Sequence, residues 1–219
     1  SENTLVAKIK VENRKLRKKR FTLHATNIYG YPETRWWGSD GVTAANNAEI
    51  DLGVSKIWAY GDVFTLGSDE PASAFKATAD EVEWNSWISD NDLTSNDGAS
   101  VRMPGPLYAV KTYDVEVGGR KDVSFYLVLT RGKTESANIT VHQNALRNAQ
   151  DDLEQFIQND NSFYALAPAL TGDWPASWRH GWIYDWETLR MNIRNPLGNY
   201  KHHWDAMQPF TPRVVLGET

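Results

Sequence analysis

The chain of 219 residues contains no cysteine. It therefore has no disulfide framework, no thiolate ligand for a metal ion and no thiol nucleophile, which excludes disulfide-stapled scaffolds and cysteine enzymes. Long apolar runs are missing too, because no stretch approaches the roughly 18 residues that a membrane-spanning helix requires. We therefore expect a protein that is not an integral membrane protein, and nothing in the sequence calls for a cofactor.

The first residues also lack the apolar core of a secretory leader, since Ser1 to Lys10 contains no apolar stretch of the length that a leader requires. Together with the absence of cysteine, this favours synthesis in the cytoplasm, while export of a cysteine-free protein stays an alternative. The final location, in a virion or outside the cell, stays open.

The chain has no overall excess of positive charge, and its formal net charge is -5. Contact with phosphates favours a basic surface, so this balance argues against nucleic acid as a general partner. A hydrophobic content of 41% and a charged content of 23% are those of a packed globular protein and exclude a disordered one.

What is present in the first two thirds of the chain is mainly strand. Residues 5–12 alternate apolar and charged side chains, and a second strand is predicted over 21–29. Because six cations in seven residues lie between them, we predict a hairpin with a basic tip. The clearest hairpin joins 107–117 to 123–130 through Gly118 and Gly119, residues that tolerate a positive φ.

Further strands are predicted over 49–52, over 56–66 with a break at Gly61 and Asp62, and over 137–141. About six to eight strands at this spacing are typical of a mainly β, antiparallel sandwich or jelly-roll-like fold.

The last third of the chain follows a helical period. Apolar residues at steps of three and four predict an amphipathic helix over 144–159, and a short helix is predicted to begin after Asp185. A final strand is predicted over 213–216. We expect a single domain over 1–219. In it, a helical, tryptophan-rich segment, 143–219, packs on a β-rich body, 1–142.

Ten tryptophans are an unusual number, and four of them recur at steps of four, at positions 174, 178, 182 and 186. They could form an aromatic platform for sugar rings or nucleobases, or fill space between helices and sheet. Most aromatic side chains are largely buried, which favours the core interpretation. Adjacent tryptophans point to opposite sides, so the candidate ligand-binding loop is the one with Trp36 and Trp37 and their neighbours Tyr29, Tyr31 and Arg35.

The basic segment is the second candidate site, for an anionic partner or for subunit contact, through Arg14, Lys15, Arg17, Lys18, Lys19 and Arg20. Anionic lipid, sulfated glycan and nucleic acid all suit such a cluster. The acidic stretch 80–97 suits it equally well, which would make the segment a device for homo-oligomer assembly.

One loop is rich in oxygen donors, and its calcium candidates are Asp90, Asp92, Asn96 and Asp97. The loop departs from the EF-hand pattern at Ser95 and Arg102, and turn formation explains its composition more simply. The adjacent histidines at 202 and 203 diverge from a regular backbone, so no metal site and no catalytic residue is assigned.

Three functions are compatible with these patterns. The favoured hypothesis is a recognition protein of β-sandwich type, lectin- or cytolysin-like and not an enzyme, that binds a glycan or an anionic surface. The alternatives are a self-assembling structural subunit of a virus or phage particle, and a glycan-acting hydrolase with a carboxylate pair chosen among Glu33, Asp185 and Glu187.

Overall fold

A computed structural model of the chain describes residues 3–29, 42–57, 62–90, 92–94, 107–194, 201–202, 204–207 and 216–218. The chain divides into two compact units, Ser1–Gln155 and Phe156–Thr219. We call them the β-unit and the tail unit. The single domain expected over 1–219 stays a prediction.

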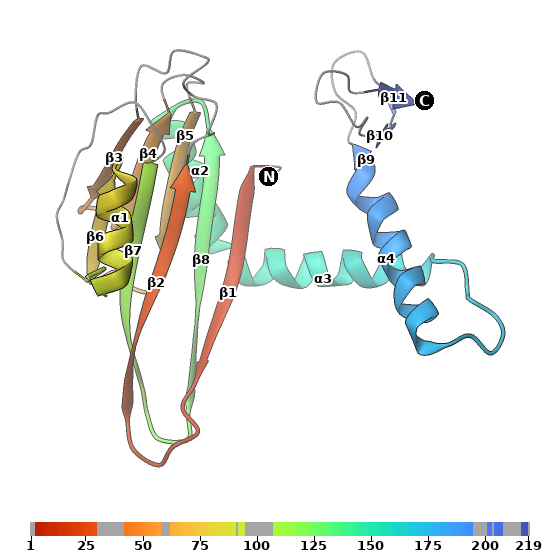
Figure 1. The fold of residues 1–219 in the computed structure, drawn as a ribbon, viewed down its shortest axis with the longest axis horizontal. Helices are drawn as coiled ribbons and strands as arrows, with labels where there is room; N and C mark the ends of the chain where they lie inside the picture. The colour runs from red at the N-terminus through yellow and green to blue at the C-terminus, as the bar shows by residue number, and fades with distance from the viewer. Residues whose placement is uncertain are drawn as a thin grey trace. The chain divides into compact units, whose positions relative to one another are not determined.

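The β-unit contains two antiparallel sheets, which are visible as two layers of arrows in Figure 1. The larger sheet has five strands, in the order β1 (Thr4–Glu12), β8 (Asp122–Gly132), β5 (Asp62–Ser68), β4 (Leu52–Ile57) and β3 (Val42–Asn47). The smaller has three, in the order β2 (Lys19–Tyr29), β7 (Leu107–Val117) and β6 (Ala74–Thr78). The antiparallel prediction is confirmed.

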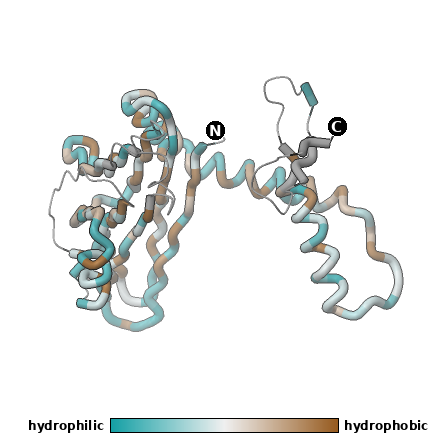
Figure 2. The backbone as a smooth tube through the Cα atoms, turned by 45° about the horizontal axis from the view of Figure 1, so that its top comes forward, coloured by the Kyte–Doolittle hydropathy of each residue, from teal (hydrophilic) through white to brown (hydrophobic). Residues whose placement is uncertain are grey.

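The two sheets pack face to face through shared apolar clusters. One cluster joins Tyr113 and Val115 of β7 to Phe125 of β8, and the rings of Tyr113 and Phe125 lie 6.1 Å apart. A second joins Phe75 of β6 to Ala44 of β3. Along the long strands the hydropathy alternates from residue to residue, as Figure 2 shows, because each strand has one face in these clusters.

The described residues form four helices as well as the sheets, so the architecture is mixed α/β rather than mainly β with two helices. They are α1 (Glu81–Asp90), α2 (Glu135–Arg147), α3 (Ala149–Ala165) and α4 (Ala176–Asn192). In α1, Trp84 stacks on Tyr108 of β7 with ring centroids 5.4 Å apart. Because α1 covers one side of the small sheet and the large sheet covers the other, β7 is buried on both faces from residue 107 to 113.

Helix α2 contains the segment 137–141 that was predicted as a strand, and this prediction was wrong. Two buried polar side chains, Asn138 and His142, lie one helical turn apart and reach the large sheet. The Asn138 amide donates to the carbonyl of Val63 (2.9 Å), and a hydrogen bond joins His142 Nδ1 to Thr65 Oγ1 (2.9 Å). These tertiary contacts override the local strand preference.

The two predicted hairpins are also corrected. Strands β1 and β2 belong to different sheets, as do β7 and β8; instead β1 pairs with β8 and β2 pairs with β7 over their full lengths. The chain therefore reverses at both predicted places, but each reversal crosses from one sheet to the other. The predicted strand at 49–52 is wrong as well, since 48–51 form the turn that joins β3 to β4.

The tail unit holds the end of α3, all of α4, and a small antiparallel sheet of β9 (Ile193–Arg194), β10 (Trp204–Met207) and β11 (Leu216–Glu218). The helix predicted over 144–159 is broken at Asn148, between α2 and α3, and the helix predicted from Asp185 begins earlier, at Ala176. Trp186 stacks on Phe163 of α3 with centroids 5.0 Å apart, and Arg190 pairs with Asp160.

Candidate anionic-surface site

Two chain reversals lie side by side at one end of the β-unit. Residues 13–18 join β1 to β2 and residues 118–121 join β7 to β8. Backbone hydrogen bonds connect them, from Asn13 N to Lys121 O (2.9 Å) and from Arg120 N to Lys15 O (2.8 Å). The pairing of β1 with β8 and of β2 with β7 brings the two loops together, although about 100 residues separate them in sequence.

Asn13 holds the two loops in place. Its side chain is 3% exposed, and its amide nitrogen lies within 3.0 Å of three backbone carbonyls, those of Arg17, Val117 and Gly118. Its carbonyl oxygen accepts a hydrogen bond from Lys15 N (3.0 Å). A buried polar group with every hydrogen-bonding atom in use defines one geometry, so the loops form a preorganised surface.

Glycine is required in the second loop for space and not for its φ. A Cβ at position 119 would lie 1.9 Å from the carbonyl oxygen of Leu16, which is backbone and has no room to yield. The positive φ of this turn, 54°, belongs to Arg120, whereas neither glycine adopts one. The predicted role of the two glycines is thereby corrected.

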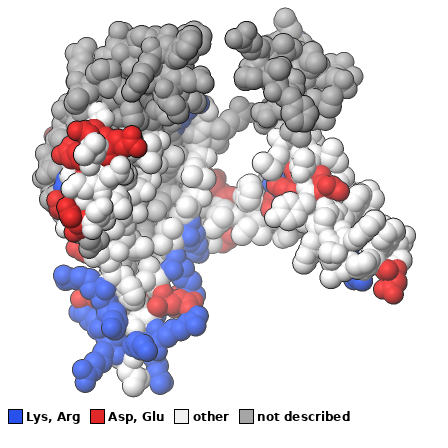
Figure 3. Space-filling view, in the orientation of Figure 1, with Lys and Arg blue, Asp and Glu red and all other residues white. Residues whose placement is uncertain are grey.

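The cations of both loops gather on this end of the unit, where Figure 3 shows a dense blue patch. We call residues 12–20 and 116–122 the basic tip. It contains eight lysines and arginines and three carboxylates, for a net charge of +5, in a chain whose net charge is -5. All six cations predicted from the basic segment belong to it, and the second loop adds Arg120 and Lys121.

Two of the eight cations are neutralised locally. Arg14 pairs with Glu12 (3.3 Å) and Lys18 pairs with Glu116 (2.5 Å). Beside the tip, the hydrogen bond that Lys10 donates to Glu12 and the charge of Asp122 raise the pKa of Lys10, and the same hydrogen bond lowers the pKa of Glu12. Glu12 therefore stays ionised over the physiological range and compensates part of the positive charge.

The other six cations make no side-chain ion pair with any described residue, and these are Lys15, Arg17, Lys19, Arg20, Arg120 and Lys121. All are exposed. Among them lies Leu16, whose side chain is 74% exposed at the crest of the first loop. A groove of about 300 Å³ opens between the loops and is lined by Asn13, two carboxylates and three cations. The tip thus combines exposed cations without a described ion-pair partner, one exposed apolar side chain and a groove.

The acidic stretch 80–97 does not pair with the tip in the described residues, because its carboxylates serve nearby groups. Asp80 accepts a hydrogen bond from Val82 N (2.8 Å) and caps α1, and Glu83 accepts one from Thr78 (2.5 Å). Whether it contacts the tip of another copy stays a prediction.

The calcium candidates are engaged in the same way. Asp92 forms an ion pair with Lys76 Nζ (2.9 Å), and Asp90 accepts a hydrogen bond from Ser86 (3.1 Å). Asn96 and Asp97 lie outside the described residues, and the described part of the chain brings no three histidine, aspartate or glutamate side chains together for a metal.

Most of the predicted ligand-binding loop lies outside the described residues. Tyr31, Arg35, Trp36 and Trp37 lie outside the described residues, and only the backbone of Tyr29, the last residue of β2, is described. That site stays a prediction.

Sequence reasoning missed Asn13, Leu16, Arg120 and Lys121 as parts of the tip. A signal for the last two was present, since Arg120 and Lys121 directly follow the predicted turn. No signal in the sequence brings that turn to the basic segment, because the contact depends on which strands pair.

No protein-family model matches the chain, and a search of curated proteins finds no relative. Within the described ranges, no helix combines the length and the apolar character that crossing a bilayer would demand.

Proposed function

We propose that the β-unit is a sandwich-type recognition module that binds an anionic lipid surface through the basic tip. The observation that carries the proposal is the exposed Leu16, which lies among six cations that form no ion pair with a described residue, on two loops that hydrogen bonds connect. Cations attract acidic headgroups, and a leucine at the crest can enter the acyl boundary behind them. The face-to-face packing of the two sheets supports the sandwich assignment for this unit.

Leu16 favours a lipid over a soluble polyanion. Sulfated glycans and nucleic acids attract cations but contain no apolar phase, so an exposed leucine does not raise the affinity for them. Transfer of most of a leucine side chain out of water changes a binding constant by roughly tenfold, and each cation near an anionic membrane changes it by roughly fivefold. Both contributions are measurable with single substitutions.

The test is co-sedimentation of the full chain with vesicles of phosphatidylcholine, with and without 30% phosphatidylserine, at several salt concentrations. The wild type should bind only the anionic vesicles, and more weakly as salt rises. The double substitution Arg17→Gln with Arg120→Gln should weaken binding roughly 25-fold. The matched control, Arg147→Gln with Arg179→Gln, removes the same charge from exposed positions outside the tip and should leave binding nearly unchanged.

Leu16→Gln separates the lipid from other polyanions. It should weaken vesicle binding about tenfold and leave binding to heparin or to duplex DNA unchanged. Equal losses on all three probes, or no loss on vesicles, would contradict the lipid assignment. A wild type that ignores phosphatidylserine vesicles at low salt would refute the proposed function.

A second candidate function is assembly into a larger particle, and the tail unit favours it. Twelve of the eighteen exposed large apolar side chains in the described residues lie in this unit, including Leu166, Tyr184 and Met191. Apolar surface of this extent marks protein interfaces. Light scattering of the purified chain should then give a mass of several copies, which Tyr184→Ser with Met191→Ser would reduce; a monomer at high concentration would exclude this function.

A further inference from the structure

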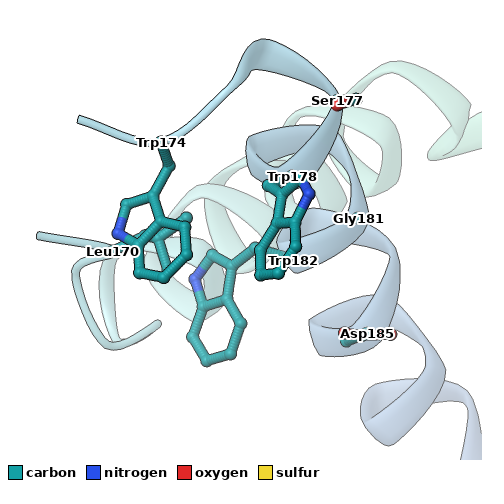
Figure 4. A pocket seen from close by; sticks show the side chains of 7 residues that line it. All are labelled: Leu170, Trp174, Ser177, Trp178, Gly181, Trp182 and Asp185. Atoms are coloured by element: carbon teal, nitrogen blue, oxygen red, sulfur yellow. The ribbon is translucent and has the colours of Figure 1, made fainter. Parts of the chain in front are cut away.

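The tail unit contains a groove lined by aromatic rings that is separate from the basic tip. It has a volume of about 460 Å³ and is formed by Leu170, Trp174, Ser177, Trp178, Gly181, Trp182 and Asp185. This volume lies in the range of small-molecule sites, roughly 300–1,000 Å³. Figure 4 shows the three indole rings gathered at the N-terminal half of α4 and the segment before it.

Two of the three indoles are fixed by hydrogen bonds to the backbone. Trp174 Nε1 donates to the carbonyl of Thr171 (2.7 Å), and Trp182 Nε1 donates to that of Pro168 (3.1 Å). Trp178 stacks on Trp174, with ring centroids 5.1 Å apart and an angle of 20° between the ring planes. The aromatic wall is therefore preorganised, although Trp178 is 61% exposed and Trp174 is 36% exposed. An indole that is fixed by stacking, as Trp178 is on Trp174, and yet stays 61% exposed is unusual for a side chain that only fills space.

Helical geometry places the rest of the groove on the same face. Trp178, Gly181, Trp182 and Asp185 follow one another at steps of three, one and three, which is one stripe of an α-helix. A Cβ at Gly181 would meet nothing within 4 Å, so the glycine leaves a notch in the stripe. The notch lets a ligand reach the helix surface between the rings and the carboxylate.

The polar groups of the groove are available to a ligand. Trp178 Nε1, the Ser177 hydroxyl and the Asp185 carboxylate make no hydrogen bond or ion pair with any described residue. They supply a donor, a group that both donates and accepts, and a strong acceptor. Flat aromatic faces next to such a mixed set match a neutral sugar ring, which presents C–H groups on its faces and hydroxyls around its edge. A quaternary ammonium ion would use the rings and the carboxylate but neither donor.

We propose that this groove is a carbohydrate-binding site for a neutral pyranose ring. The sugar lies over Gly181 with one face on the exposed indole of Trp178, and its edge hydroxyls bond to Asp185 and Ser177. The site is independent of the basic tip, so it goes beyond the proposed lipid binding and survives or fails separately. Because the groove is open to solvent, single rings should bind weakly and oligosaccharides more tightly.

The test is saturation-transfer NMR and calorimetry with the full chain and the tetrasaccharides of glucose, mannose, galactose and N-acetylglucosamine, with choline chloride as a comparison. At least one oligosaccharide should bind. Trp178→Ala should weaken that binding at least tenfold, and Asp185→Asn should weaken it severalfold. Tyr184→Ala, an exposed aromatic outside the groove on the same helix, is the matched control and should change nothing.

Gly181→Leu gives the sharpest variant, because its Cβ would meet nothing within 4 Å, its side chain would extend into the notch, and leucine is a better helix former than glycine. It should abolish sugar binding while thermal stability stays equal or rises, which separates a blocked groove from a misfolded unit. Binding that survives both Gly181→Leu and Trp178→Ala would overturn the proposal. Failure of all four tetrasaccharides, or a response to choline alone, would overturn it too.

Discussion

The substitution Asn13→Ala tests whether geometry, rather than charge, makes the basic tip. Asparagine and alanine are both neutral, so the net charge of +5 is unchanged. The substitution removes a side-chain amide whose two hydrogens are donated to three backbone carbonyls, so that one hydrogen is shared between two of them. It also removes the amide oxygen that accepts a hydrogen bond from Lys15 N.

The expected cost follows from the number of hydrogen bonds. The substitution removes two donated hydrogen bonds, one of them shared between two carbonyls, and one accepted hydrogen bond, at about 1 kcal/mol each. Because the carbonyl of Val117 is then left buried without this partner, the free energy of unfolding should fall by roughly 2–4 kcal/mol. For a unit of this size that corresponds to a melting temperature lower by about 5–15 °C. Vesicle binding should weaken as well, since the two loops no longer present their cations together.

Urea unfolding and vesicle co-sedimentation measure both effects. Asn85→Ala is the control, because Asn85 is exposed on α1 and its side chain makes no hydrogen bond among the described residues. If Asn13→Ala unfolds at the same urea concentration as the wild type, the hydrogen bonds do not organise the loops. If stability falls but vesicle affinity is unchanged, charge is sufficient and preorganisation is irrelevant.

Three further predictions concern the β-unit. Gly119→Ala should lower the melting temperature sharply because its Cβ meets backbone at 1.9 Å, whereas Gly118→Ala, which meets a flexible lysine side chain at 3.2 Å, should be tolerated; a thermal melt of each decides. Burial lowers the pKa of His142 from 6.5 to about 4, so protonation favours the unfolded chain, and stability should fall as pH drops from about 6.5 to 4. The loss should reach roughly 3 kcal/mol in urea titrations, and His142→Gln should flatten it. Asp51→Asn should cost roughly 3 kcal/mol in the same assay, because Lys111 is 0% exposed and would lose its charged partner at 2.7 Å, while Lys111→Met, which leaves Asp51 near water, should cost less.

Part of the fold could be predicted because it depends on patterns of neighbouring residues in the sequence. The alternation in β1 reflects a strand with one buried face, and both chain reversals occur where the sequence places them. The partner of each strand could not be predicted, since a turn reverses the chain whether or not its strands stay paired. The buried residues of β7 from 107 to 113 depend on α1 as well, which no window along β7 contains.

In the tail, the burial expected for large rings is not found at Trp174, which is 36% exposed, or at Trp178, which is 61% exposed. The four-residue spacing of Trp174, Trp178 and Trp182 was visible, and burial was the statistical expectation for large rings. A unit of about sixty residues buries a smaller share of its surface than a full-sized domain, so it leaves some of its large side chains exposed. Here two of those rings are fixed by backbone carbonyls, a feature that sequence spacing does not encode.

The distribution of charge resolves an apparent conflict between the acidic chain and an anionic partner. The net charge of -5 includes a tip of +5, so all other residues together carry -10. At physiological salt, charges interact over about 8 Å, so a surface within that distance of the tip meets its local charge of +5. The total charge therefore does not argue against the proposed anionic partner, because the local charge of the tip acts on a nearby surface, and this charge favours the orientation in which the tip faces that surface.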